Sequence, residues 1–135
     1  GLRLHVLTGR AKKSLARLEP AGRVVRHRHL GGLAAEVSVC FTMLPAPDDV
    51  RGVVLGDDGL LPGLKRGAIV IDCSTSSAEL AAEIDQKLRT INGGAVDAPV
   101  SGLPVRAKAG TLAIMLAVSG ILFGGTLWLA KRFSW

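Results

Sequence analysis

Residues 68–97, AIVIDCSTSSAELAAEIDQKLRTINGGAVD, hold a strand, a helix and the start of a second strand. The apolar run from Ala68 to Asp72 predicts a buried strand, and the hydroxyl residues Ser74 to Ser77 offer caps for the helix that follows. The helix is indicated by apolar residues recurring at intervals of four, four and three: Leu80, Ile84, Leu88 and Ile91. Asn92-Gly93-Gly94 terminates it, and 95–97 begin a strand. This order is typical of a parallel sheet with helices packed on it.

The same alternation continues toward the N-terminus. Val37 to Leu44 is a continuous apolar run with the composition of a strand covered on both faces. Pro45 and Pro47 end it because neither can donate to a ladder, and Asp48 is expected to cap a helix that continues through Val54.

Three more elements are expected before this run. Leu2 to Leu7 predicts a strand, Ala11 to Leu18 a helix, and Arg23 to His29 an edge strand with several basic residues. The fold class expected from these patterns is therefore α/β, with a mainly parallel sheet.

Composition limits the class of protein. The chain has 135 residues, about one domain, and its 48% hydrophobic and 21% charged residues are a globular balance. The net charge of +6 is uneven, because residues 1–30 hold eight of the 17 Lys and Arg side chains and a single acid, Glu19. No aromatic residue lies between Gly1 and Val39, so stacking on bases has no support and nucleic acid is not an expected partner. A solvated helix face and an exposed edge explain these charges more simply.

The two cysteines indicate neither a metal site nor a disulfide. Cys40 and Cys73 each lie in an apolar run, with no CxxC and no histidine nearby in sequence. No metal is expected, and the default is a reduced cytoplasmic chain. Residues 1–5 contain no uninterrupted apolar segment of the kind that a signal peptide needs.

Five ordered blocks of sequence carry a family resemblance. They are FTMLP at 41–45, VLGDDGLL at 54–61, GAIVIDCST at 67–75, DAPVSG at 97–102 and AGTLAIM at 109–115. In this order and spacing they resemble the 3-hydroxyisobutyrate dehydrogenase family, the β-hydroxyacid dehydrogenases. The similarity covers roughly residues 1–116 and includes Gly9-Arg10, which looks like the family's Asn-Arg turn.

The resemblance implies an NAD(P)-dependent oxidoreductase with a Rossmann cofactor domain. Arg10 would then face the adenosine ribose and accept a 2′-phosphate, which favours NADP while leaving NAD open. Leu44 and Pro45 match the loop under the cofactor, Asp49 falls where a cofactor-side Asn is often found, and Thr75 matches a residue near the nicotinamide. Read without the resemblance, Pro45 only ends a strand and Thr75 only caps a helix.

The implied substrate is a short 3-hydroxy acid. Ser101 and Gly102 match the family's substrate-carboxylate loop, although Ser101 read alone only shapes a turn. Leu103 departs from the family because a second Gly is usual there. Neither Lys131 nor any other Lys can be matched to the family's catalytic Lys, so no catalytic residue is expected in this chain and little turnover from it alone.

The resemblance also predicts what the domain lacks. The family's GxGxxG turn has no match, so the first expected strand corresponds to the family's second. In the order 3-2-1-4-5-6 this leaves a gap between the second and fourth strands. Residues 1–116 are thus expected to form a partial NADP-binding Rossmann domain, an incomplete doubly wound sheet, and 117–135 an apolar helical segment unlike the family.

The end of the chain leaves alternatives open. Residues 112–130 contain no charged side chain and just reach the length of a membrane span. A tail anchor, an apolar helix packed on the domain, and an end altered by truncation or a shifted reading frame all fit. The alternative function is accordingly a non-catalytic binding module or a membrane-anchored remnant of the fold, and a homo-oligomer remains open.

Overall fold

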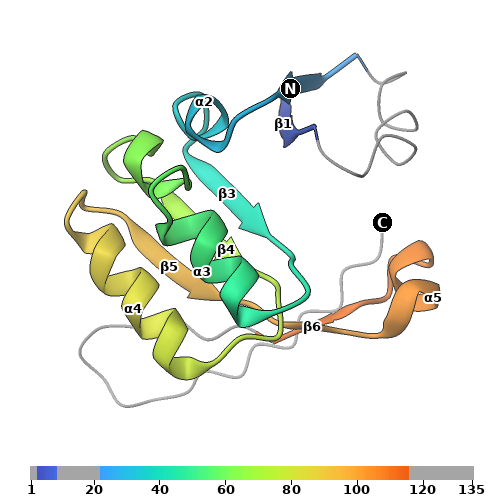
Figure 1. Ribbon diagram of the computed structural model, residues 1–135. Helices are drawn as coiled ribbons and strands as arrows, with labels where there is room; N and C mark the ends of the chain where they lie inside the picture. The colour runs from blue at the N-terminus through green and yellow to red at the C-terminus, as the bar shows by residue number, and fades with distance from the viewer. Residues whose placement is uncertain (1–2, 9–21, 116–135) are drawn as a thin grey trace.

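The computed structural model describes residues 3–8 and 22–115 (Figure 1). At its centre is a parallel sheet of three strands in the order β3 (Val39–Thr42), β4 (Ile69–Asp72) and β5 (Gly94–Asp97). Parallel neighbours require long crossovers, and here they are supplied by the helical segments between the strands. The expected α/β class and parallel pairing are confirmed, and the fold is Rossmann-like.

Two smaller sheets accompany the central one. Strands β1 (Leu4–Leu7) and β2 (Val24–His27) pair in parallel, with His5 opposite Val25. Strands β6 (Val100–Ser101) and β7 (Ala113–Ile114) pair antiparallel. Within the described residues β1 does not pair with β3, so the sheet is divided where the strand order predicted a gap.

Two helices cover one face of the central sheet. Figure 1 shows α3 (Pro47–Leu55) and α4 (Ala78–Arg89) side by side in front of β3, β4 and β5. A short helix, α2 (Leu30–Ala34), packs against the 3₁₀ turn η2 (Leu61–Gly63). The core between helices and sheet is apolar, and its fully buried larger side chains are Val50, Val54, Val70, Leu80 and Leu88. These residues anchor the framework that holds the strand ends in place.

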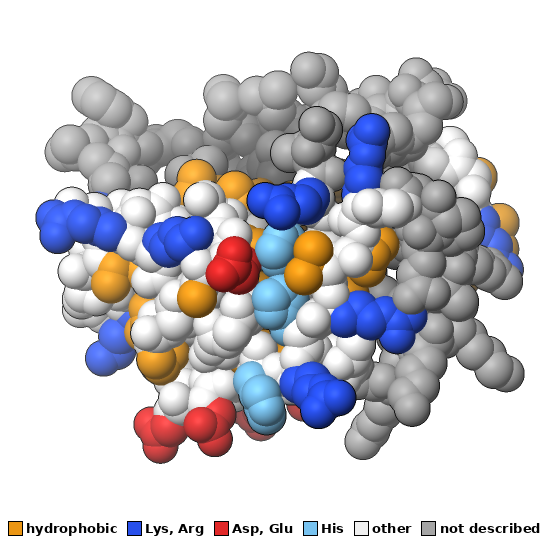
Figure 2. Space-filling view, turned by 90° about the horizontal axis from the view of Figure 1, so that it is seen from above, with side chains coloured by type: hydrophobic (Ala, Val, Ile, Leu, Met, Phe, Trp, Pro, Cys, Tyr) orange, Lys and Arg blue, Asp and Glu red, His pale blue; other side chains and the backbone are white. Residues whose placement is uncertain are grey.

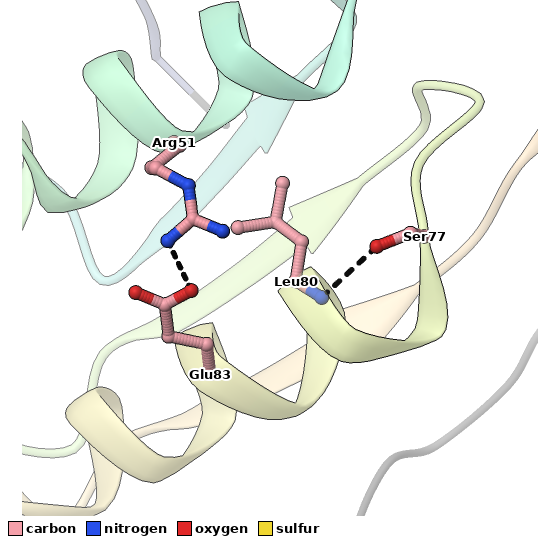
Figure 3. Close-up of polar contacts among 4 residues, drawn as sticks. All are labelled: Arg51, Ser77, Leu80 and Glu83. Carbon is pink, nitrogen blue, oxygen red and sulfur yellow. Dashed lines mark hydrogen bonds and ion pairs between the residues drawn. The ribbon is translucent and has the colours of Figure 1, made fainter.

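Helix α4 follows the predicted pattern closely. Leu80, Ile84 and Leu88 are buried against the sheet, as the apolar stripe requires. Of the four hydroxyl residues, Ser77 is the N-cap, and its Oγ accepts a hydrogen bond of 3.2 Å from the Leu80 N–H (Figure 3). The same figure shows the ion pair of Arg51 with Glu83, which joins α3 to α4.

The predicted cap of α3 is wrong. Ala46 occupies the N-cap position and Pro47 begins the helix, so Asp48 lies in its first turn. Proline suits that place because its fixed φ matches the helix and the N–H it lacks would have no partner there. Asp48 and Asp49 still favour this end of the helix, since negative side chains complement the helix dipole.

The prediction that both faces of β3 are covered is also wrong. Cys40 and Thr42 are buried, whereas Val39 and Phe41 are 45% and 71% exposed. The reason is that α3 and α4 pack on the Cys40 side only, and strand side chains alternate between the two faces.

The N-terminal strand pair carries the basic surface. Figure 2 shows histidines gathered on one face among Lys and Arg side chains. His5 Nδ1 lies 2.9 Å from His27 Nε2, which links β1 to β2. Arg23 and Arg28 are exposed, in agreement with the expected solvated edge. The predicted helix at 11–18 lies outside the described residues.

Of the predicted C-terminal segment 112–130, only the first residues, up to 115, lie within the described part of the chain. Ala113 and Ile114 lie in β7, so this part of 112–130 is a strand. The rest of that segment, and the apolar helix expected within 117–135, lie outside the described residues. Among 3–8 and 22–115, no helix is long and apolar enough to cross a membrane.

Candidate functional site

The carboxyl ends of β3, β4 and β5 meet at one edge of the central sheet. Parallel register places Thr42 opposite Asp72 and Asp72 opposite Asp97, so a row of three polar side chains crosses the sheet. In open α/β sheets ligands bind outside the carboxyl ends of the strands. This edge is therefore the candidate site.

Asp72 is the centre of a buried hydrogen-bond network. Its Oδ1 accepts 2.8 Å from Thr42 Oγ1 and 3.1 Å from the Ser74 backbone N–H. The Ser74 hydroxyl in turn accepts 2.9 Å from the Leu44 N–H. Thr42, Asp72 and Ser74 are only 5%, 7% and 3% exposed, so these bonds have little competition from water.

A third loop joins the same edge through backbone bonds. The Ala98 N–H donates 2.7 Å to the Asp72 carbonyl, and the Val100 N–H donates 3.4 Å to the Cys73 carbonyl. Because Val100 precedes Ser101, these bonds tether the expected substrate loop to the end of β4. The loops after β3, β4 and β5 thus form one connected surface.

Burial and one neighbouring charge raise the pKa values of two side chains at this edge, Asp97 and Cys73. The pKa of Asp97 is raised by its burial and, secondarily, by the charge of Asp72 on the next strand. Burial also raises the pKa of the Cys73 thiol, again with a contribution from Asp72. Cys73 is thus a thiol rather than a thiolate near neutral pH, which disfavours a nucleophilic or metal-binding role.

Three of the predicted cofactor residues lie on this surface. Leu44 is half-buried and fixed by Ser74, Pro45 follows it and is exposed, and Thr75 is exposed in the loop between β4 and α4. Asp49 is exposed in the first turn of α3. Arg10 lies outside the described residues.

The predicted substrate loop has a backbone that favours glycine. Ser101 is exposed at the end of β6, and Gly102 precedes α5 (Leu103–Lys108) with a φ of +142°. A Cβ at Gly102 would lie 2.8 Å from Arg106 Cδ, so the aliphatic part of Arg106 packs against this glycine. An arginine therefore lies beside the loop expected to hold a carboxylate.

The sequence patterns do not single out Asp72 and Ser74. They predict Asp72 only as the end of a strand, and Ser74 only as one of several helix caps. A signal was present, because Thr42, Asp72 and Asp97 each end an apolar strand at a position that faces the helices. Polar residues repeated at that place in adjacent strands indicate a shared network.

One more observation concerns the loop that carries Thr75. Within the described residues, Ser76 Oγ is a buried side-chain oxygen without a hydrogen-bond partner in the protein. Buried polar atoms are almost always satisfied, by water or a ligand where the protein offers nothing. Ser76 Oγ is thus a buried polar atom of this loop that the described protein groups leave unsatisfied.

The comparison with known families agrees with this architecture. The family model for the NAD binding domain of 6-phosphogluconate dehydrogenase matches residues 1–123. The chain belongs to this family. Its parallel central sheet is in keeping with an NAD-binding domain, and the predicted family relationship is confirmed.

Relatives of this NAD-binding domain carry the names expected from the sequence. A probable 3-hydroxyisobutyrate dehydrogenase-like protein of Arabidopsis thaliana is 46% identical over 82 residues, which are 61% of this chain and 26% of that protein. A 3-hydroxyisobutyrate dehydrogenase of Pseudomonas aeruginosa is 40% identical over 78 residues, 58% of this chain and 26% of its own length. The chain thus matches about a quarter of the length of these curated relatives.

A solved structure has a similar fold. The structure described as Psf3 in complex with NADP⁺ and 2-OPP has a TM-score of 0.72 and 27% identity, over 85% of this chain and 40% of its own. The described part of the NAD-binding domain contains no group of three or more His, Cys, Asp and Glu side chains that could hold a metal ion.

Proposed function

We propose that this chain forms part of the cofactor and substrate site of an NADP-dependent dehydrogenase that acts on a short 3-hydroxy acid. The observation that carries the proposal is the connected surface formed by the loops after β3, β4 and β5, in a chain that belongs to an NAD-binding family. Named relatives support the choice of substrate class.

The residues divide into a cofactor group and a substrate group. Leu44 and Pro45 would lie under the cofactor, with Asp49 on its flank and Thr75 beside the nicotinamide. When bound, the nicotinamide would exchange a hydride with the carbinol carbon of the substrate.

Ser101 and Gly102 would hold the carboxylate of that substrate. A serine hydroxyl and backbone N–H groups bind an anion without adding a formal charge. Arg106 lies against Gly102 and adds positive charge beside the loop. No lysine of this chain is assigned to proton transfer.

The preference for NADP rests on Arg10. A guanidinium binds a phosphate by paired, charge-assisted hydrogen bonds, whereas NAD presents only a 2′-hydroxyl. The NADP⁺ named with the structural neighbour supports this choice.

Nucleotide titration of the purified chain tests the proposal. We expect Arg10→Glu to weaken NADP binding about tenfold or more, since it replaces an attraction by a repulsion, and to change NAD binding little. Arg23→Glu is the matched control, because it makes the same charge change at an exposed position immediately before β2. Failure of the unaltered chain to bind either nucleotide contradicts the proposal, and equal losses in the two variants contradict the role of Arg10.

A further inference from the structure

The loop after β3 is held from the neighbouring strand. Leu44 and Pro45 follow β3, and proline has no N–H, so the Leu44 N–H is the last backbone donor before the turn. That N–H donates to Ser74 Oγ, which belongs to the loop after β4. The position of one loop therefore depends on a side chain of the other.

Asp72 in turn fixes Ser74. Its Oδ1 accepts from the Ser74 N–H and from Thr42 Oγ1, so one carboxylate oxygen binds the ends of both strands. Because Ser74 is 3% exposed and Asp72 7%, neither side chain is free to choose another rotamer in solvent. Because Thr75 directly follows Ser74, fixing Ser74 also restricts the position of Thr75.

We propose that Asp72 and Ser74 are positioning residues that set the geometry of the cofactor loops, Leu44–Pro45 and Thr75, without touching the cofactor themselves. This inference rests on the proposed function. It adds to it the two buried side chains on which the placement of the nucleotide depends. Such pre-organisation lowers the cost of ordering the loops when the ligand binds.

The test compares two serines with the same chemistry. Ser74→Ala removes the acceptor of the Leu44 N–H, and Ser77→Ala removes the acceptor of the Leu80 N–H at the cap of α4. Both variants lose an acceptor for a backbone N–H, and Ser77→Ala also loses a side-chain hydrogen bond with Glu79, but only Ser74 is bonded to the cofactor loop. We expect Ser74→Ala to raise the Kd for NADP about fivefold, the loss of roughly one hydrogen bond, and Ser77→Ala to leave it within about twofold.

A conservative pair tests Asp72. Asp72→Asn keeps an acceptor oxygen for Thr42 and Ser74, whereas Asp72→Ala removes it. We expect the asparagine to retain most of the NADP affinity and the alanine to lose it. If Asp72→Ala does not fold, the comparison of Ser74→Ala with Ser77→Ala still tests the positioning role. Equal effects of Ser74→Ala and Ser77→Ala overturn the proposal, because they assign the loss to general loosening.

An independent readout separates this proposal from the function itself. Amide hydrogen exchange at Leu44 is expected to accelerate in Ser74→Ala and not in Ser77→Ala, whether or not a nucleotide binds. If the unaltered chain binds no nucleotide but Leu44 exchange follows this pattern, the proposed function fails and the positioning of the loop stands. Unchanged exchange at Leu44 in Ser74→Ala overturns the positioning proposal.

Discussion

Thr42→Val tests whether the Asp72 network stabilises the fold. The change is nearly isosteric, and valine is as favourable as threonine in a strand, so the chief loss is the hydroxyl that donates 2.8 Å to Asp72. Asp72 would keep the Ser74 N–H as a donor, but its buried carboxylate would lose one of the two bonds described here. Hydrogen bonds to charged groups contribute about 1.5–3 kcal/mol, so we expect a loss of about 2 kcal/mol in the free energy of unfolding.

Urea denaturation at pH 7, followed by circular dichroism, measures this loss as a shift of the midpoint at constant slope. Thr90→Val is the matched control, since Thr90 is exposed and its Oγ1 donates 2.7 Å to the Lys87 carbonyl. Surface changes of this kind usually stay within about 0.5 kcal/mol. If Thr42→Val costs no more than Thr90→Val, the reasoning about the buried network is refuted.

Two further predictions concern the same edge. The pKa of Asp97 is raised by burial and by Asp72, so the fold favours its protonated form; the stability this adds is present at pH below the ordinary Asp value and is lost as the pH rises through the raised pKa. Asp97→Asn should therefore weaken this loss between acid and neutral pH in urea denaturation, and an unchanged pH profile would count against it. Gly102→Ala should destabilise the chain by about 1–3 kcal/mol, because a φ of +142° is strained for alanine and its Cβ would lie 2.8 Å from Arg106 Cδ. Adding Arg106→Ala should recover only the part due to the Cδ contact, because the Cβ at position 106, 2.9 Å from the added Cβ, remains; complete recovery would show that neither the backbone nor this second contact is strained.

The strands and α4 could be predicted because their signals are local. Leu80, Ile84 and Leu88 repeat at helical spacing, and the same three side chains fill the space between α4 and the sheet. The structure moves the boundaries slightly, as at β3, where the apolar run 37–44 contains a strand of four residues, Val39–Thr42. Apolar character continues past the last paired residue, so it does not mark where pairing ends.

What could not be predicted depends on contacts between distant residues. The apolar run of β3 predicts burial on both faces, but which face the helices cover is decided by the packing of α3 and α4, and Phe41 lies on the other side. Similarly, Ser74 and Ser77 are equivalent hydroxyls in sequence. The fold separates them, because Ser77 bonds within α4 and Ser74 reaches 30 positions back along the chain to Leu44.

The acidic edge needs an explanation, since the proposed ligand is itself an anion. Asp72 and Asp97 are neighbours across β4 and β5, and two ionised carboxylates there would repel a dinucleotide. Two features of the structure bear on this repulsion. Asp72 directs Oδ1 toward the donors Thr42 and Ser74 inside the protein, and the raised pKa of Asp97 keeps its proton to a higher pH than an ordinary aspartate would. The same carboxylate that holds the two loops together thus has its charge partly balanced by the hydrogen bonds through which it holds them.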